Sequence, residues 1–151
     1  MPRFEGRGEG RDARGAGGHR RGALRRVQEF YRYYNVPGMG HCTGGPGANA
    51  FGQQGSPAVP ADPEHDALLA LRRWVEEGVA PEAIVATKYN NNAPSDGVQF
   101  TRPLCPYPQT ATYKREGDPA DAASFACVGQ DLSPENNIGL AVERLRVSPD
   151  R

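Results

Sequence analysis

Long apolar runs are missing from this 151-residue sequence, in which no segment approaches the roughly 18 to 20 apolar residues that a helix needs to cross a bilayer. The first residues also lack the apolar region of a secretory signal. We therefore expect neither a membrane span nor a signal peptide in this chain. Only 37% of the residues are apolar, whereas 19 are glycine and 14 are proline. We expect one part of the chain to fold and another part to remain disordered.

Cysteine and serine are also scarce. The chain has three cysteines, an odd number, so in an oxidising compartment one thiol lacks an internal partner or pairs with another chain. None of the five serines precedes Ser56, and residues 1–40 contain no serine, threonine or cysteine. The first 40 residues therefore supply no hydroxyl or thiol nucleophile.

Residues 1–26 hold an excess of positive charge. They contain eight arginines and three acidic residues, which gives 8 − 3 = +5 and leaves −5 for the rest of a chain whose formal charge is zero. Because this segment is rich in glycine and poor in apolar residues, we expect a disordered arm. Two alternatives remain: an arm that binds nucleic acid through phosphate contacts, and an unnatural start of the sequence.

The first ordered element is expected at residues 29–36, an aromatic and β-branched run that predicts a strand. Pro37 and Gly38 then predict a turn. Residues 43–61 are rich in glycine and proline and predict a long loop.

Residues 84–89 predict a second strand, followed by a cluster of turn formers over residues 90–97. Residues 98–101 have the composition to pair back with this strand as a hairpin. Prolines 103, 106 and 108 exclude a helix and a central strand over the segment that follows.

The strongest local signals predict a helix over residues 63–77, with Asp62 as its cap and Gly78 as its terminator. Its apolar residues recur at helical spacing and predict one stripe packed in the core, made of Ala67, Leu68, Leu71, Trp74 and Val75. A last amphipathic helix is expected over residues 133–147.

His41 stands on a glycine-rich loop directly after the first predicted strand, where a general base can be held by a scaffold and still meet a ligand. An isolated histidine in a loop is more often just an exposed polar residue. In α/β hydrolases, the nucleophile and the acid precede the histidine along the chain. Asp12 is the only aspartate before His41, so the chain does not supply a complete triad in that order.

Five ordered motifs connect the sequence to a known family. They are Val36-Pro37-Gly38-Met39-Gly40-His41-Cys42, Gly44-Gly45-Pro46-Gly47-Ala48-Asn49-Ala50-Phe51-Gly52, Asp66-Ala67-Leu68-Leu69-Ala70-Leu71 with Trp74-Val75-Glu76, Ala80-Pro81 with Ile84-Val85-Ala86-Thr87, and Thr101-Arg102-Pro103-Leu104-Cys105-Pro106-Tyr107-Pro108. Together they resemble the C-terminal part of the tannase and feruloyl esterase family, which also includes mono(2-hydroxyethyl) terephthalate hydrolase. The similarity runs from about Gln28 to Cys127.

The resemblance implies roles for the histidine and the cysteines. In this family the catalytic serine and histidine each lie beside a cysteine, and the two cysteines form a disulfide. His41 would then be the catalytic base, and Cys42 the disulfide cysteine beside it, whose partner is absent from this chain. Cys105 and Cys127 resemble a second family disulfide. A zinc site built from these cysteines with His41 or His65 has no metal-binding spacing behind it.

The implied fold class is α/β, the C-terminal portion of an α/β-hydrolase fold with a disulfide-linked tail and a disordered N-terminal arm. Residues 1–26 would be the arm, residues 27–127 the C-terminal part of the catalytic domain, and residues 128–151 a tail with a possible short helix. Without its sheet neighbours, such a segment would expose the apolar residues of residues 30–36 and of the helix stripe to water.

The implied function is that of a serine-type carboxylic ester hydrolase acting on aromatic acyl esters in full-length form, with this chain inactive alone. The alternatives are a non-enzymatic binding module with a nucleic-acid-binding arm, and one half of a split esterase. The expected partners are an aromatic ester and the missing N-terminal part of the catalytic domain, with no membrane contact. Nucleic acid is not a favoured partner. No cofactor is expected in this chain, since any calcium site of the family would lie in the missing lid. The family is largely exported, so the resemblance implies an extracellular or periplasmic location.

Overall fold

The computed structural model describes residues 22–129. The predicted helix over residues 133–147 and most of the predicted arm lie outside the described residues. The chain divides into two units, and their described parts are residues 22–31 and residues 32–129. Within residues 22–129, no helix combines the length and the apolar character that crossing a membrane requires.

A short helix occupies residues 22–28 of the first unit. The last five residues of the predicted disordered arm are therefore helical, which corrects that boundary. The helix contains good helix formers, namely Ala23, Leu24, Arg25 and Arg26, and this local preference overrides the glycine-rich composition of the arm as a whole.

Helix α2 (Ala67–Glu77) begins four residues later than predicted. The N–H of Ala67 donates to the carbonyl of Phe51 at 2.8 Å rather than to the preceding helical turn. Asp66 is the N-cap, and its carboxylate accepts the N–H groups of Leu68 and Leu69 at 2.9 and 3.0 Å. The helix ends as predicted at Gly78, which has a φ of 72°.

The predicted cap Asp62 closes a separate turn before α2. Its carboxylate accepts the N–H groups of Glu64 and His65 at 2.8 and 3.0 Å. Two consecutive aspartate caps thus divide the predicted helix into a turn and a helix.

The apolar stripe of α2 is mostly exposed. Leu68, Leu71 and Val75 are 67%, 51% and 77% exposed, whereas Ala70 is buried in the core. The prediction that the whole stripe packs in the core is therefore wrong for the residues described. Leu68, Leu71 and Val75 face solvent, whereas Ala67 packs against the core.

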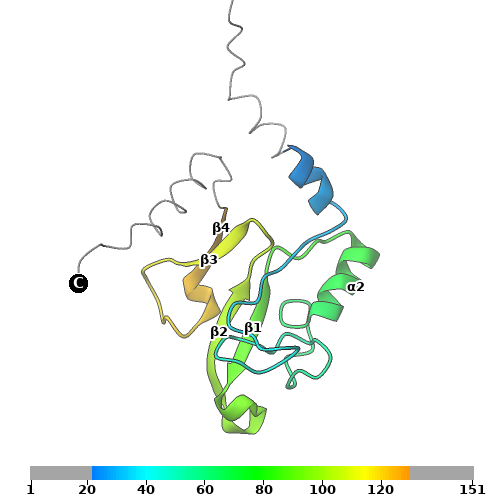
Figure 1. Cartoon of the computed structure of the whole chain (residues 1–151). Helices are drawn as coiled ribbons and strands as arrows, with labels where there is room; N and C mark the ends of the chain where they lie inside the picture. The colour runs from blue at the N-terminus through cyan, green and yellow to red at the C-terminus, as the bar shows by residue number, and fades with distance from the viewer. Residues whose placement is uncertain (1–21, 130–151) are drawn as a thin grey trace, which may run out of the picture. The chain divides into compact units, whose positions relative to one another are not determined.

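A β-hairpin forms the centre of the second unit (Figure 1). Strand β1 (Ile84–Tyr89) pairs antiparallel with β2 (Val98–Leu104), from Ile84 opposite Leu104 to Tyr89 opposite Val98. The short 3-10 helices η1 (Asn90–Asn92) and η2 (Pro94–Asp96) connect the two strands. The predicted hairpin is confirmed, and β2 extends three residues further than predicted. Among the described residues β2 pairs only with β1, which leaves the open edge that Pro103 requires.

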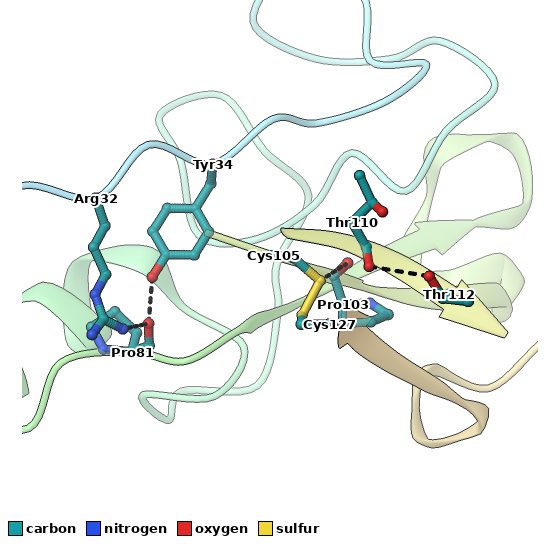
Figure 2. The surroundings of a disulfide bond; sticks show 8 residues. All are labelled: Arg32, Tyr34, Pro81, Pro103, Cys105, Thr110, Thr112 and Cys127. Atoms are coloured by element: carbon teal, nitrogen blue, oxygen red, sulfur yellow. Dashed lines mark hydrogen bonds between the residues drawn. A yellow bond between two sulfur atoms is a disulfide. The ribbon is translucent and has the colours of Figure 1, made fainter. Parts of the chain in front are cut away.

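The second hairpin joins β3 (Gln109–Tyr113) to β4 (Phe125–Gly129), and the 3-10 helix η3 (Ala122–Ser124) precedes β4. Every residue of β3 is exposed. A disulfide links Cys105, directly after β2, to Cys127 in β4, with the two Cα atoms 5.5 Å apart (Figure 2). The disulfide therefore fastens the second hairpin to the end of the first.

The predicted strand over residues 29–36 does not form. Its only pairing is a single bridge between Tyr34 and Pro106, extended by a hydrogen bond from the N–H of Tyr107 to the carbonyl of Tyr33. A strand needs a partner along its whole length, and the described residues provide one at this single position.

Tyr34 and Arg32 hold this segment in place through their side chains. Both donate to the carbonyl of Pro81 at 2.5 Å, in the segment that leads to β1 (Figure 2). Burial raises the pKa of the Tyr34 hydroxyl, so the hydroxyl stays protonated and remains a donor.

The core of the second unit is small. Its buried members come from the loop before α2, from α2 and from the first hairpin, and they are Ala48, Ala70, Ile84, Ala86 and Leu104. Three of the five are alanine, so backbone segments approach one another closely. This close approach places the loop after His41 against β1.

Candidate functional site

The loop that carries His41 presents two chemically reactive side chains on the protein surface. His41 and Cys42 are exposed, and the Cys42 sulfur lies 3.1 Å from Nδ1 of His41. Cys42 has a φ of 66°, which non-glycine residues adopt only where the surrounding structure imposes it. A fixed backbone thus presents an imidazole and a thiol side by side.

Residues 44–47 form the support beneath this loop. The N–H of Gly40 donates to the carbonyl of Gly44 at 3.0 Å, and the N–H of Gly47 donates to the carbonyl of Gly38 at 2.9 Å. A Cβ on Gly45 would collide with the carbonyl oxygen of Gly38 and lie 2.7 Å from the nitrogen of Gly40. Gly45 and Gly47 have no room for a side chain here, because two backbone segments are in direct contact.

A buried polar cluster holds residues 44–47 against the first hairpin. Lys88 of β1 is 8% exposed, and its ammonium donates to the carbonyl of Gly45 at 2.6 Å and to Oδ1 of Asn92 at 2.5 Å. Asn49 is 1% exposed, and its amide donates to the same Oδ1 at 3.2 Å and to the carbonyl of Gly47 at 3.1 Å. We define Lys88, Asn49 and Asn92 as the Lys88 cluster.

Sequence reasoning missed the Lys88 cluster. The sequence predicts Asn92 as part of a turn, and its φ of 57° agrees with this. Its side chain also accepts hydrogen bonds from Lys88 and Asn49. The available signal was Lys88 itself, the single charged residue of the predicted strand over residues 84–89, since a charge in a buried strand must find partners.

Gln53 fixes the far side of the loop. Its amide nitrogen donates to the carbonyl of Asn49 at 2.6 Å and to the carbonyl of Cys42 at 3.3 Å, while its oxygen accepts the N–H of Phe51 at 3.1 Å. The residue after His41 is therefore tied directly to the segment that the Lys88 cluster holds.

An apolar cavity of about 330 Å³ borders the base of the loop. Pro37 and Gly47 form one wall, and β2 with the start of β4 forms the other. Arg102 is its only titratable lining residue, and the guanidinium lies 4.8 and 4.3 Å from the ring centres of Phe100 and Phe125. The residues that line this cavity include no general acid or base.

The imidazole of His41 has few partners within the described part of the chain. No serine hydroxyl and no carboxylate of residues 22–129 is hydrogen-bonded to it, and its hydrogen-bonding partner is the sulfur of Cys42. In the same region of the chain, no group of three or more histidine, cysteine and acidic residues is arranged to hold a metal ion. A triad is not assembled from these residues.

His65 has a different environment. Its Nδ1 lies 2.8 Å from Oδ1 of Asp62, and this hydrogen bond is the main reason why the pKa of Asp62 is lowered. The pair belongs to the turn before α2 and is bonded to no other predicted site residue.

The three cysteines form one disulfide and one free thiol. Cys105 and Cys127 are bonded to each other, and Cys42 is free. The structure therefore brings together His41 with Cys42, and Cys105 with Cys127, as two separate pairs.

Comparison with known proteins places this geometry in one family. The family model described as tannase and feruloyl esterase matches residues 11–128 of the chain. An uncharacterized esterase of Xanthomonas campestris pv. campestris is 54% identical over 107 residues, which are 70% of this chain and 19% of the relative. A probable feruloyl esterase B-1 of Aspergillus flavus is 41% identical over 102 residues, covering 68% of this chain and 19% of the relative.

Solved structures give the same assignment. An esterase from Aspergillus oryzae superimposes with a TM-score of 0.63 at 39% identity, over 69% of this chain and 20% of that one. Feruloyl esterase B from Aspergillus oryzae superimposes with a TM-score of 0.59 at 34% identity, over 68% and 20%. The chain thus spans about a fifth of the length of the relatives it matches.

Proposed function

Because the chain belongs to the tannase and feruloyl esterase family, we propose that it carries the histidine half of the catalytic centre of a carboxylic ester hydrolase. His41 would act as general base, taking the proton from a serine hydroxyl and returning it to the leaving alcohol. The observation that carries this proposal is the loop itself, which presents an exposed imidazole on a backbone fixed by glycine contacts.

The nucleophile and the orienting carboxylate would come from another part of the catalytic domain. This part of the proposal is supported by the absence of any hydroxyl or carboxylate bonded to His41 among residues 22–129. The exposed stripe of α2 supports it as well, because Leu68, Leu71 and Val75 form an apolar face of the kind that covers a larger α/β sheet.

Cys42 would pair with a cysteine beside the serine, which would tie nucleophile to base. Its exposed sulfur beside His41 is available for such a bond. Export to an oxidising compartment would follow, and the disulfide between Cys105 and Cys127 agrees with it. No cofactor takes part in the proposed reaction.

The substrate class we propose is an ester of an aromatic acid such as ferulic acid. This proposal rests on the names of relatives such as the probable feruloyl esterase B-1 of Aspergillus flavus. The acyl-binding residues would lie in the part of the domain that this chain does not match.

A chimeric enzyme tests the role of His41. Residues 27–127 replace the matching segment of the Xanthomonas campestris esterase, and hydrolysis of methyl ferulate and of 4-nitrophenyl acetate is measured. We expect His41→Ala to lower kcat about a thousandfold or more with little change in KM, because a general base acts in the transition state. His65→Gln is the matched control and should keep full activity. A chimera that hydrolyses either ester as well with His41→Ala as without it would overturn the proposal.

A further inference from the structure

A buried charge of strand β1 contacts the segment that supports the His41 loop. Lys88 is 8% exposed, and no carboxylate within the described residues lies within salt-bridge distance of it. A buried ammonium without a counter-charge costs free energy unless its hydrogen bonds are satisfied. Its known acceptors are the carbonyl of Gly45 and Oδ1 of Asn92. A charge retained in such a place calls for an explanation other than the stability of β1.

One acceptor of Lys88, the carbonyl of Gly45, lies in the segment that contacts the His41 loop. Gly45 packs against the backbone of Gly38 and Gly40, and Gly47 donates to the carbonyl of Gly38. Gly40 immediately precedes His41. Any displacement of residues 44–47 therefore moves the backbone from which the imidazole projects.

Asn92 joins two donors at a single oxygen. Its Oδ1 accepts from the ammonium of Lys88 and from the amide of Asn49, and Asn49 also donates to Gly47. Lys88 therefore binds the carbonyl of Gly45, and Asn49 binds the carbonyl of Gly47, both in the segment 44–47. The segment is fixed at two points rather than one, which restricts rotation as well as translation.

We propose that Lys88, Asn49 and Asn92 are positioning residues for His41, holding residues 44–47 as a rigid support under the imidazole. The inference rests on the proposed function of His41 and adds the device that fixes its orientation. The charge on Lys88 strengthens its hydrogen bonds to the Gly45 carbonyl and to Asn92, since charge-assisted hydrogen bonds are stronger than neutral ones.

Three substitutions in one turn separate this role from general stability. Asn92 and Asn91 both have a positive φ, 57° and 52°, so glycine fits either position without backbone strain. Asn92→Gly removes the shared acceptor, whereas Asn92→Asp keeps an oxygen for both donors. Asn91→Gly is the matched control, because the Asn91 amide bonds Asp96 and lies outside the cluster.

The first readout is hydrogen–deuterium exchange of the whole chain, followed in peptides that cover residues 37–48. Asn92→Gly should increase the exchange of the Gly40 and Gly47 amides roughly tenfold, the factor that corresponds to 1.4 kcal/mol. Asn92→Asp and Asn91→Gly should exchange like the unaltered chain, and β3–β4 peptides should be unchanged in all variants. Equal exchange in Asn92→Gly and Asn91→Gly would overturn the proposal.

The second readout reports on the imidazole itself. The carbon–proton NMR signals of the His41 ring should move in Asn92→Gly and return in Asn92→Asp, while those of His65 stay fixed by Asp62. An unmoved His41 signal together with faster exchange would show that the cluster only stabilises the loop, and would refute positioning. Neither readout requires activity, so failure of the chimeric esterase would leave this result standing on its own.

Discussion

Replacing Gly45 with alanine should displace the backbone that carries His41. Gly45 has a φ of 87°, and an added Cβ would collide with the carbonyl of Gly38 and approach the nitrogen of Gly40 to 2.7 Å. The left-handed conformation costs an alanine about 1 to 2 kcal/mol, and overpacking adds about 1 to 3 kcal/mol. We therefore expect the free energy of unfolding to fall by about 2 to 5 kcal/mol.

Gly44 provides the matched control. It has a φ of 70°, but an added Cβ would meet nothing within 4 Å. Gly44→Ala should therefore cost only the conformational part, about 1 to 2 kcal/mol. Urea unfolding followed by the fluorescence of Trp74, the only tryptophan, measures both variants. Equal losses in Gly44→Ala and Gly45→Ala would refute the idea that close packing of two backbone segments fixes the loop.

Three further predictions concern the rest of the second unit. Replacing Cys105 and Cys127 together by serine opens a 22-residue loop and should lower stability by about 3 kcal/mol in urea unfolding; a negligible loss would contradict it. The hydrogen bond from His65 lowers the pKa of Asp62 from its ordinary value of 3.8. This hydrogen bond therefore stabilises the folded chain above pH 3.8, and the stabilisation is lost as pH falls through the pKa of Asp62 in the folded state. The melting temperature should therefore change less between pH 6 and pH 3 in Asp62→Asn than in the unaltered chain, and an equal change in both would contradict this prediction. Leu71→Glu, on the exposed stripe of α2, should reduce self-association in sedimentation and weaken binding of a hydrophobic dye, and a monomeric parent chain that binds no dye would show the stripe to be harmless.

The elements that the sequence predicts correctly are those determined by residues close to one another along the chain. The hairpin of β1 and β2 follows from two β-prone runs separated by turn formers, and the end of α2 follows from Gly78. The predicted start of α2 was wrong because Asp62 and Asp66 can both cap a helix. A distant contact decided between them, the hydrogen bond from the Ala67 N–H to Phe51.

The predictions that failed needed knowledge of long-range contacts. Residues 29–36 have strand composition, but a strand forms only where a neighbour runs beside it, and here the pairing is limited to Tyr34 and Pro106. The Lys88 cluster joins residues 43 positions apart, such as Asn49 and Asn92, and no local pattern shows which residues these side chains bind. The motif around His41 predicts a catalytic base, and this stays a prediction. The contacts by which the fold holds the His41 loop could not be predicted from that motif.

The proposed role of His41 is tested most directly by comparing this chain alone with the same chain mixed with the remaining part of a related esterase. Turnover of 4-nitrophenyl acetate is measured for the purified chain, and for its mixture with a Xanthomonas campestris esterase lacking the matching segment. We predict that the chain alone does no better than free imidazole, and that the mixture is active and loses its activity with His41→Ala. Steady turnover by the isolated chain, abolished by His41→Ala, would contradict the account, because it would place a nucleophile within this chain.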